Sequence, residues 1–504
     1  TLDRSSAASD VYKRQAYANR LPAASIGTAA MPAAPAVDMA YDQRQRTVYD
    51  ALGRAVLQVD GTGALVRQRF DANGNVIERI AYATRVPANV ALTSAAIEAA
   101  LATAADAARD LRTVNAYDGI GRLTHVMDGL GAVTENIYDA AGNRVRQIQY
   151  ATPVAAGGDP RSVQGSMKDR ASDWVYDGMG RQIASVDPTG AVTRRVLDAN
   201  GNAIQVISYA VRLGAGVPRT GEAILASLQP GALDRATTTA FDAAGRAVLV
   251  IDAERGVQRN TYDAAGNLLE SYRYSAPLTG ADLAGVAPAS LTLAALTARL
   301  PAADSQGRST RSVYGANGLP VYKIDAAGFV TQLTYDTRGN VTSSRRYANG
   351  VLLGSTPSAA DVAAVLSADN TRDRVDTFVF DAAGRLLGST DSLGKSESYG
   401  YDGVGNKVRF VNKAGNEWTY EYDAAGRLLV ERTPQTSVVD TSWSGAGDLV
   451  VGATKSISMV TRNVYDGLGN LVSRTEADGQ PQAKTTRYVL SLIHISEPTR
   501  PERI

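Results

Sequence analysis

The sequence contains no cysteine and only two histidines, His125 and His494, among 504 residues. Without thiols the chain cannot form disulfides, thiolate metal sites or a cysteine nucleophile. Two histidines leave almost no means of building a histidine metal site or a Ser-His-Asp triad. These shortages exclude most metalloenzymes and hydrolases, and they predict a protein without a cofactor.

The chain also has almost no net charge, because 52 Lys and Arg residues are balanced by 51 Asp and Glu residues. A nearly neutral chain has little electrostatic attraction for phosphate backbones or anionic lipids. No run of 18 apolar residues occurs. The sequence therefore predicts no nucleic-acid partner and no membrane span.

Phenylalanine and tryptophan are scarce, at 6 and 3 residues, whereas tyrosine (23) and glycine (47) are plentiful. Many of the tyrosines and glycines fall in one motif, aromatic-Asp-x-x-Gly-Arg/Asn, which occurs in full 12 times. The copies begin at Tyr49, Phe70, Tyr117, Tyr138, Tyr176, Phe241, Tyr262, Tyr335, Phe380, Tyr401, Tyr422 and Tyr465. Two degenerate copies begin at Leu197 and Tyr314, and seven of the intervals between the starts of neighbouring copies are 21 residues long. A fixed period of this kind is the signature of a repeat array.

A second turn of the form Asp-x-x-Gly lies inside each 21-residue unit, for example at residues 60–63 and 187–190. The turn at residues 252–256 reads as one residue longer. Asp accepts hydrogen bonds from the backbone that follows it, and Gly supplies a positive φ. The stretches between turns are short and rich in Val, Ile, Leu, Thr and Tyr, as strands are. We therefore expect an all-β fold in which strands and turns alternate in one antiparallel meander.

Copies ending in Arg are followed 21 residues later by copies ending in Asn, and inserts of variable length follow most pairs. Ala- and Leu-rich inserts at residues 93–109 and 291–300 are predicted to be helical, and Ser358 with Asp361 resembles a capping box. These helices are expected to lie against the sheet, stiffening it or covering an edge. Neither face of a strand such as 133–138 is uniformly apolar, so the strand pattern predicts a sheet wetted on both faces.

The motif at residues 117–122, Tyr-Asp-Gly-Ile-Gly-Arg, and its 21-residue spacing resemble the YD-repeat family, also called Rhs (rearrangement hotspot) repeats. The resemblance covers roughly residues 41–488. Members of the family are large exported bacterial proteins, including polymorphic toxins and insecticidal toxin complexes, and the animal teneurins share the fold. The resemblance implies a β-sheet that spirals into a hollow, solenoid-like β-shell around a C-terminal toxic domain. The sequence departs from the family in lacking its Asp-Pro-x-Gly-Leu core segment, because residues 187–190 are an ordinary repeat turn.

Four segments are expected along the chain. Residues 1–15 and 489–504 resemble translated sequencing-adapter read-through, with VYKRQ and LIHISEPTRP as the matching stretches. Residues 16–40 are an Ala/Pro-rich linker or partial repeat, and residues 41–488 are the repeat array. We therefore expect an internal fragment of a longer protein, without a signal peptide of its own, whose two terminal segments lie outside the fold.

Several features could carry chemistry, yet each has a simpler interpretation. The repeated Asp residues could bind Ca²⁺, but isolated carboxylates favour turn capping over a dense oxygen cage. The motif arginines could line an anion- or sugar-binding groove, although pairing with Asp or water is favoured. His125 is expected to be structural. Residues 442–447 lack both the G-x-S-x-G order of a nucleophile elbow and the third glycine of a dinucleotide fingerprint. No catalytic, cofactor-binding or metal-ligating residue is predicted.

The sequence thus predicts a non-enzymatic structural array. It would form part of the shell of a secreted or surface-exposed bacterial protein that encapsulates and delivers a toxin, and its partner would be a payload of the same parent chain. The alternative is a cell-surface adhesin or wall-associated module that binds glycans through exposed Tyr and Trp. A toxin domain or an anchoring signal further along the parent gene would separate the two.

Overall fold

The computed structural model describes residues 11–16, 36, 42–87, 90, 94–106, 109–155, 157–279, 292–300, 306–354, 356–443 and 449–488. Thirty of the described strands are assigned to one sheet, and two more form a separate hairpin. The chain divides into two compact units. The first comprises Thr1–Thr134, Tyr150–Ser166 and Ser396–Ile504, and the second comprises Glu135–Gln149 and Met167–Lys395. The predicted all-β meander with short helical inserts is confirmed.

The described part of the first unit is built mainly of strands, with one α-helix and one 3₁₀ helix. Its elements are β1 (Val11–Ala16), β2 (Gln43–Tyr49), β3 (Ala55–Asp60), β4 (Leu65–Phe70), β5 (Val76–Ala81), α1 (Ser94–Ala104), β6 (Leu111–Tyr117), β7 (Leu123–Met127), η2 (Pro160–Ser162), β24 (Ser396–Tyr401), β25 (Lys407–Val411), β26 (Glu417–Tyr422), β27 (Leu428–Arg432), β28 (Thr436–Trp443), β29 (Leu449–Ile457), β30 (Val460–Tyr465), β31 (Leu471–Glu476) and β32 (Lys484–Arg487). The strand β8 (Val133–Tyr138) includes the boundary between the two units.

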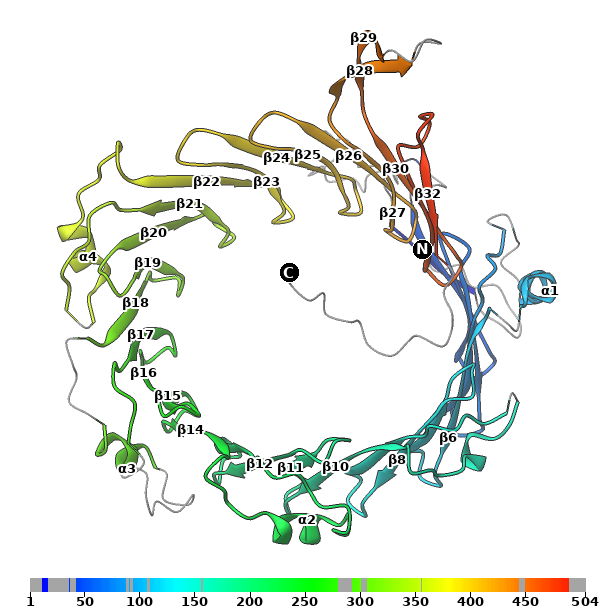
Figure 1. Cartoon of the computed structure of the whole chain (residues 1–504), viewed down its shortest axis with the longest axis horizontal. Coiled ribbons are helices and arrows are strands. Elements are labelled where there is room, and N and C mark those ends of the chain that lie inside the picture. Colours follow the sequence, from blue (N-terminus) through cyan, green and yellow to red (C-terminus); the bar gives the residue numbers. More distant parts are fainter. Residues whose placement is uncertain are drawn as a thin grey trace, which may run out of the picture. The chain divides into compact units, whose positions relative to one another are not determined.

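The second unit repeats the same design with three helical inserts. Its elements are β9 (Arg144–Gln149), β10 (Arg170–Tyr176), β11 (Gln182–Val186), β12 (Val192–Leu197), β13 (Ala203–Ser208), α2 (Gly221–Ser227), β14 (Arg235–Phe241), β15 (Ala247–Ile251), β16 (Val257–Tyr262), β17 (Leu268–Arg273), α3 (Leu293–Thr297), β18 (Arg308–Tyr314), β19 (Pro320–Ile324), β20 (Val330–Tyr335), β21 (Val341–Arg346), α4 (Ala359–Val365), β22 (Arg374–Phe380) and β23 (Leu386–Thr390). In Figure 1 these strands follow one another in chain order.

Strands pair with their neighbours along the chain, and the pairing is antiparallel throughout the described ladders, as in β14 with β15 and β15 with β16. In the first unit β27 pairs directly with β30, so the hairpin of β28 and β29 leaves the main sheet. At each motif the register shifts by one residue just before the aromatic side chain: Ala240 faces Leu249, whereas Phe241 faces Ala247. Such a bulge increases the local twist and fixes where the strand ends.

The strand β1 pairs with β2 from Val11 opposite Val48 to Ala16 opposite Gln43. Part of the segment expected to lie outside the fold is therefore a paired strand. The interpretation of its origin stays a prediction. Residues 1–10, most of the expected linker at 16–40, and the expected terminal segment at 489–504 lie outside the described residues.

Four buried clusters form the core, one beneath each insert helix. In the second unit Leu296 of α3 is fully buried against Leu249, Ile251 and Val257, which belong to β15 and β16. Equivalent strand positions pack on α1, α2 and α4. The prediction of a sheet wetted on both faces is therefore wrong where inserts occur. One face is dry there because the insert covers it, which the strand pattern alone does not reveal.

The insert helices confirm two of the sequence predictions. α1 and α3 lie within the expected helical stretches, and α4 begins with the expected capping box. The hydroxyl of Ser358 accepts a hydrogen bond from the Asp361 N–H at 3.2 Å, while Asp361 accepts one from the Ser358 N–H at 2.9 Å. The seven-residue α2 was not predicted, since it is too short to show a helical period. The helices cover the face of the sheet rather than its edge.

Candidate functional site

The motif turn is the feature that recurs most often, and Asp242 shows its geometry. Asp242 Oδ1 accepts hydrogen bonds from the backbone N–H groups of Ala244 (2.9 Å) and Arg246 (3.0 Å). The Asp242 N–H in turn donates to the Arg246 carbonyl at 3.0 Å. Gly245 has a φ of +75°, a left-handed conformation that favours glycine. The interpretation of the repeated aspartates as turn caps is confirmed.

The second carboxylate oxygen is held by the last residue of the motif, whether that residue is Arg or Asn. Arg246 Nε donates to Asp242 Oδ2 at 2.7 Å, and Asn267 Nδ2 donates to Asp263 Oδ2 at 2.8 Å. The same bond is made by Arg54, Arg122, Arg181, Arg385 and Arg427, and by Asn75, Asn143, Asn202, Asn340, Asn406 and Asn470. The predicted pairing of the motif arginines with Asp is therefore confirmed.

A motif arginine can also hydrogen-bond to the next motif, which the shorter asparagine side chain cannot reach. Arg246 Nη1 donates to the Asp263 carbonyl at 2.7 Å, and its guanidinium lies 4.9 Å from the centre of the Tyr262 ring. Arg54 contacts the next motif in the same two ways. Arg181 keeps the carbonyl bond at 3.0 Å, although Leu197 replaces the aromatic residue there. The Arg-then-Asn alternation thus joins the two turns of a pair.

The motif tyrosines point back to the preceding motif. The Tyr262 hydroxyl donates to the Ala247 carbonyl at 3.1 Å, and Ala247 directly follows the Arg246 motif. Tyr335 makes the same bond to Pro320 at 2.7 Å. Tyrosine therefore outnumbers phenylalanine because its hydroxyl completes this bond while its ring stays half-buried.

These hydrogen bonds lower the pKa of Asp242 and Asp263. At Asp242 the largest cause is the bond from the Arg246 backbone, and at Asp263 it is the bond from the Asn267 side chain; both pKa values fall below the ordinary 3.8. Because the folded pKa of Asp242 and of Asp263 lies below the unfolded one, both turns contribute stability that is fully present above the unfolded pKa. This contribution is lost as the pH falls through the lowered folded pKa.

The second turns use the same chemistry, with one exception at residues 252–256. There the Asp252 N–H donates to the Gly256 carbonyl and the Arg255 N–H donates to the Asp252 carbonyl, both at 2.9 Å. The turn at residues 60–64 has the same two hydrogen bonds at the same sequence separations. Arg255 has a φ of +66°. The prediction of a longer turn is therefore wrong. The turn has the usual length, and an arginine occupies the position that glycine holds elsewhere.

An aspartate links the two ends of an insert by hydrogen bonds, a role that the sequence interpretation missed. Asp234 Oδ1 accepts from the Ala210 N–H (2.9 Å) and Oδ2 from the Gly231 N–H (2.8 Å), so the carboxylate joins the start of the insert to its end. Asp110 and Asp373 make corresponding bonds in their inserts. Each of the three stands directly before a strand, and that position was a visible signal.

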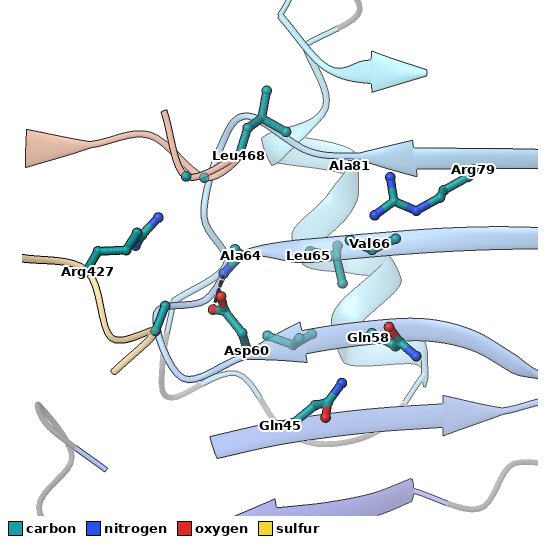
Figure 2. Close-up of a pocket in the computed structure, with 14 residues that line it drawn as sticks. Gln45, Gln58, Asp60, Ala64, Leu65, Val66, Arg79, Ala81, Arg427 and Leu468 are labelled. Atoms are coloured by element: carbon teal, nitrogen blue, oxygen red, sulfur yellow. Dashed lines mark hydrogen bonds between the residues drawn. The ribbon is translucent and has the colours of Figure 1, made fainter. Parts of the chain in front are cut away.

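A pocket of about 500 Å³ lies in the first unit, beside the strands β2 to β5 (Figure 2). Its polar lining includes Gln58, Arg79 and Arg427, and Leu468 lies at its margin on a motif turn. Its described lining residues include no aromatic side chain.

An aromatic row crosses three other strands of the first unit. Tyr399, Phe410 and Trp418 lie opposite one another on β24, β25 and β26. Their ring centres are 5.2 Å and 5.5 Å apart, and the ring planes are inclined by 27° and 31°. Cross-strand aromatic pairs of this kind stabilise a sheet, and their outer surfaces could also contact a ligand.

The remaining candidates from the sequence, His125 and the stretch at residues 442–447, lie on different parts of the chain. His125 lies in β7 opposite Ala116 of β6. Ser442 and Trp443 end β28, and the rest of the 442–447 stretch lies outside the described residues. Among the residues that the structure describes, no group of three or more His, Cys, Asp or Glu could hold a metal ion. The described helices include none that is long and apolar enough to cross a membrane.

Comparison with known proteins agrees with this repeat geometry. The protein-family model described as RHS Repeat matches residues 380–412, which contain the motifs beginning at Phe380 and Tyr401. No curated protein matches the chain. The fold and its turns define a β-repeat array, and the expected resemblance to RHS repeats is confirmed by the match at residues 380–412.

Several solved structures resemble the chain at low identity. A Photorhabdus luminescens Tc holotoxin pore with a TccC3 variant is 16% identical with a TM-score of 0.45, and the match covers 88% of this chain and 22% of that chain. A TcdB2-TccC3 crystal structure is 18% identical with a TM-score of 0.46, and the match covers 86% and 22%. The same complex without its hypervariable C-terminal region is also 18% identical, with a TM-score of 0.44 and coverage of 86% and 22%. The chain spans about a fifth of the length of these solved chains.

Proposed function

We propose that the chain is a segment of the wall of a protein shell that encloses a toxin payload belonging to the same exported bacterial parent chain. The observation that carries this proposal is the asymmetry of the sheet. In the second unit, α2, α3 and α4 all cover equivalent positions on one face, and none of the described helices lies on the other face (Figure 1).

The uncovered face of the second unit carries little negative charge. The pairing registers place hydroxyl-bearing residues such as Thr237, Thr239 and Thr331 on it. Among the described strands β9 to β23, Asp376 is the one carboxylate on this face. The same registers place apolar side chains such as Val206, Val250 and Phe378 on this face, so a payload next to it would meet a mixed polar and apolar surface with little negative charge.

The role of the wall in this proposal is mechanical, and no bond is made or broken. The motif turns join neighbouring hairpins through partly buried hydrogen bonds, as Arg246 does between Asp242 and Asp263. The inserts thicken the wall from one side. Together they give a sheet that resists opening although each strand is short.

The test is to recover the parent coding sequence and express the full chain. A toxin domain downstream of the repeats, protected from trypsin until the repeats are cleaved, would support the proposal. A downstream domain digested as fast as the same domain expressed alone would contradict it. A cell-wall anchoring signal in place of a toxin would favour the adhesin.

A second candidate function, glycan binding, is favoured by the row of Tyr399, Phe410 and Trp418. Titration of wall glycans should then change tryptophan fluorescence, and Trp418→Ala should abolish the change. Trp174→Ala is the matched control, because Trp174 lies outside the row, beneath the Arg144 guanidinium at 4.6 Å. A response that survives Trp418→Ala would exclude this row as the site.

A further inference from the structure

Arginines recur at one position on the uncovered face of the second unit. Each strand of this unit that comes directly after an insert begins with an arginine. On β14, for example, Ala240 lies opposite Leu249, which packs beneath α3. Arg235 stands five residues earlier on the same strand, so the alternation of side chains places it on the other face. We call the four equivalent residues the arginine stripe: Arg170, Arg235, Arg308 and Arg374.

The repeat framework does not require an arginine at this position. In the first unit β6 also follows an insert, yet its first residue is Leu111, which lies opposite Ala81. The motif arginines differ from the stripe, because each of them pairs with a motif aspartate, as Arg246 does with Asp242. The stripe is therefore a feature of the second unit rather than of the repeat.

Stability of the sheet does not explain the stripe either. Arg308 lies directly opposite Arg273 of β17, and like charges in opposite positions destabilise a sheet. Asp252, in a second turn, pairs with Arg273 at 2.8 Å. One carboxylate thus serves one of two facing guanidinium groups, and the stripe arginine is left over. The same arrangement recurs with Arg374, Arg346 and Asp325.

The stripe is accessible and largely unpaired. Arg170, Arg308 and Arg374 are exposed, and none of the three has an ion-pair partner among the residues that the structure describes. Arg235 pairs with Glu254, but these side chains are 67% and 66% exposed. An ion pair so open to water is weak and easily exchanged. All four guanidinium groups are therefore available to an anionic partner.

The rest of the uncovered face adds positive charge to the stripe. Arg195 and Lys323 lie on it as well, opposite Val206 and Thr331. Asp376 is the one carboxylate that the described strands β9 to β23 place there. The face is thus locally basic although the whole chain is almost neutral, and such a surface attracts negatively charged partners.

The spacing of the stripe suits an extended polypeptide. Its members stand on β10, β14, β18 and β22, so successive members are four strands, or about 19 Å, apart along the sheet. About six extended residues cover that distance. A guanidinium group binds a carboxylate through two parallel hydrogen bonds, and apolar side chains such as Val206 and Phe378 can contact the residues between. A nucleic acid carries one charge about every 3.4 Å of each strand, which widely spaced arginines match poorly.

We propose that the arginine stripe binds an extended, acidic segment of a polypeptide. Carboxylates about six residues apart pair with successive stripe arginines. The origin of this segment in the payload rests on the function proposed above, whereas the binding itself is a property of the face. A payload held in this way lies against the wall by an acidic stretch of its own chain.

Fluorescence anisotropy tests the proposal with the full chain and a fluorescein-labelled peptide of about 20 glutamates, which is long enough to span the stripe. Binding is expected at about 0.05 M salt, where screening is weak. Replacing Arg170, Arg308 and Arg374 together by Gln should weaken it about tenfold or more. The matched control replaces Arg194, Arg299 and Arg338 by Gln, which removes the same charge from the covered face, from an insert and from a motif turn. The control should bind as the unaltered chain does.

Circular dichroism melting checks that the variants fold, and the stripe variant should melt no lower than the unaltered chain because it loses two repulsive pairs. If it does melt lower, modification of the unaltered chain by phenylglyoxal replaces it. The glutamate peptide should then slow modification of the stripe arginines and leave Arg299 unchanged. Equal protection of both would contradict the proposal.

Three other results would overturn it: no binding of the glutamate peptide at low salt, equal binding by the stripe and control variants, or an oligothymidylate of the same charge that binds more tightly than the peptide. The last result would make the face a nucleic-acid surface. An enclosed toxin domain in the parent chain without peptide binding would refute this inference alone. Peptide binding through the stripe in a parent without an enclosed domain would refute the wall function alone.

Discussion

Repeats with an insert and repeats without one share the same strands but not the same core. Val313 of β18 and Val379 of β22 both stand directly before the aromatic residue of the motif. Val313 is 5% exposed and belongs to the cluster beneath Val362 of α4, whereas Val379 is 60% exposed. The difference lies in the insert rather than the strand. The motif turns are therefore the common framework, and a core forms only where an insert supplies its other half.

The largest expected effect separates these two kinds of repeat. Ile324→Ala beneath α4 should cost about 2–4 kcal/mol of local stability, because it leaves a cavity at a side chain that is 1% exposed. Val379→Ala should cost no more than about 0.5 kcal/mol, because its side chain is already in water. Urea unfolding monitored by hydrogen exchange measures the loss of stability in both variants. Equal effects would show that the insert-free repeats have a core of their own.

Acid should weaken both kinds of repeat together, because both use capped turns. The pKa values of Asp381, in an insert-free repeat, and Asp336, in a repeat that carries an insert, are lowered, chiefly by hydrogen bonds from the Arg385 backbone and the Asn340 side chain respectively. The stability from these carboxylates is complete above their unfolded pKa near 3.8 and falls as the pH drops through the lower folded values. Thermal melting from pH 6 to pH 2 should therefore stay level and then decline. A decline already complete above pH 5 would point to other groups.

A smaller effect should distinguish two motif arginines. Arg246→Gln and Arg181→Gln both remove an ion pair with the motif Asp, but only Arg246 also lies over an aromatic ring. The Arg246 variant should therefore lose about 0.5–1 kcal/mol more than the Arg181 variant. Paired urea titrations measure this difference. Identical losses would mean that the ring contact contributes nothing.

The smallest expected effect is a gain in stability. Arg255→Gly should stabilise its turn by about 0.5–1 kcal/mol, since it removes a left-handed arginine at the cost of some chain entropy. Arg255→Ala keeps the strained backbone and should give no gain, which makes it the control. Melting temperatures of the two variants decide the matter, and a loss of stability in the Gly variant would contradict the account.

The turns could be predicted from the sequence because their chemistry is local. The Asp and Gly of each motif act within six residues, so a spacing of 21 was enough to place both ends of the strands. The dry face could not be predicted. It depends on side chains such as Leu296 and Ile224, which reach the sheet only after an insert has folded back.

The candidate site was predictable to a similar extent. The pairing of Arg with Asp could be predicted because both residues lie in one turn. The hydrogen bond from Arg246 to the Asp263 carbonyl could not, because it depends on how two neighbouring hairpins are aligned. The left-handed conformation of Arg255 could not be predicted from the sequence, because the pattern assigns the left-handed position to a glycine and Gly256 follows one position later. The hydrogen bond from the Gly467 N–H to the Ala83 carbonyl joins residues that no local pattern connects.

Residue-resolved hydrogen exchange of Gly142→Val tests the central claim, that stability in this array is local. Gly142 has a φ of +90° and open space where a Cβ would stand, so the substitution adds a backbone penalty of about 1–2 kcal/mol without a clash. Protection should fall in β8, β9 and their neighbours and remain unchanged in β24 to β26, and Ala141→Val serves as the control. A uniform loss of protection from residue 49 to residue 470 would contradict the account.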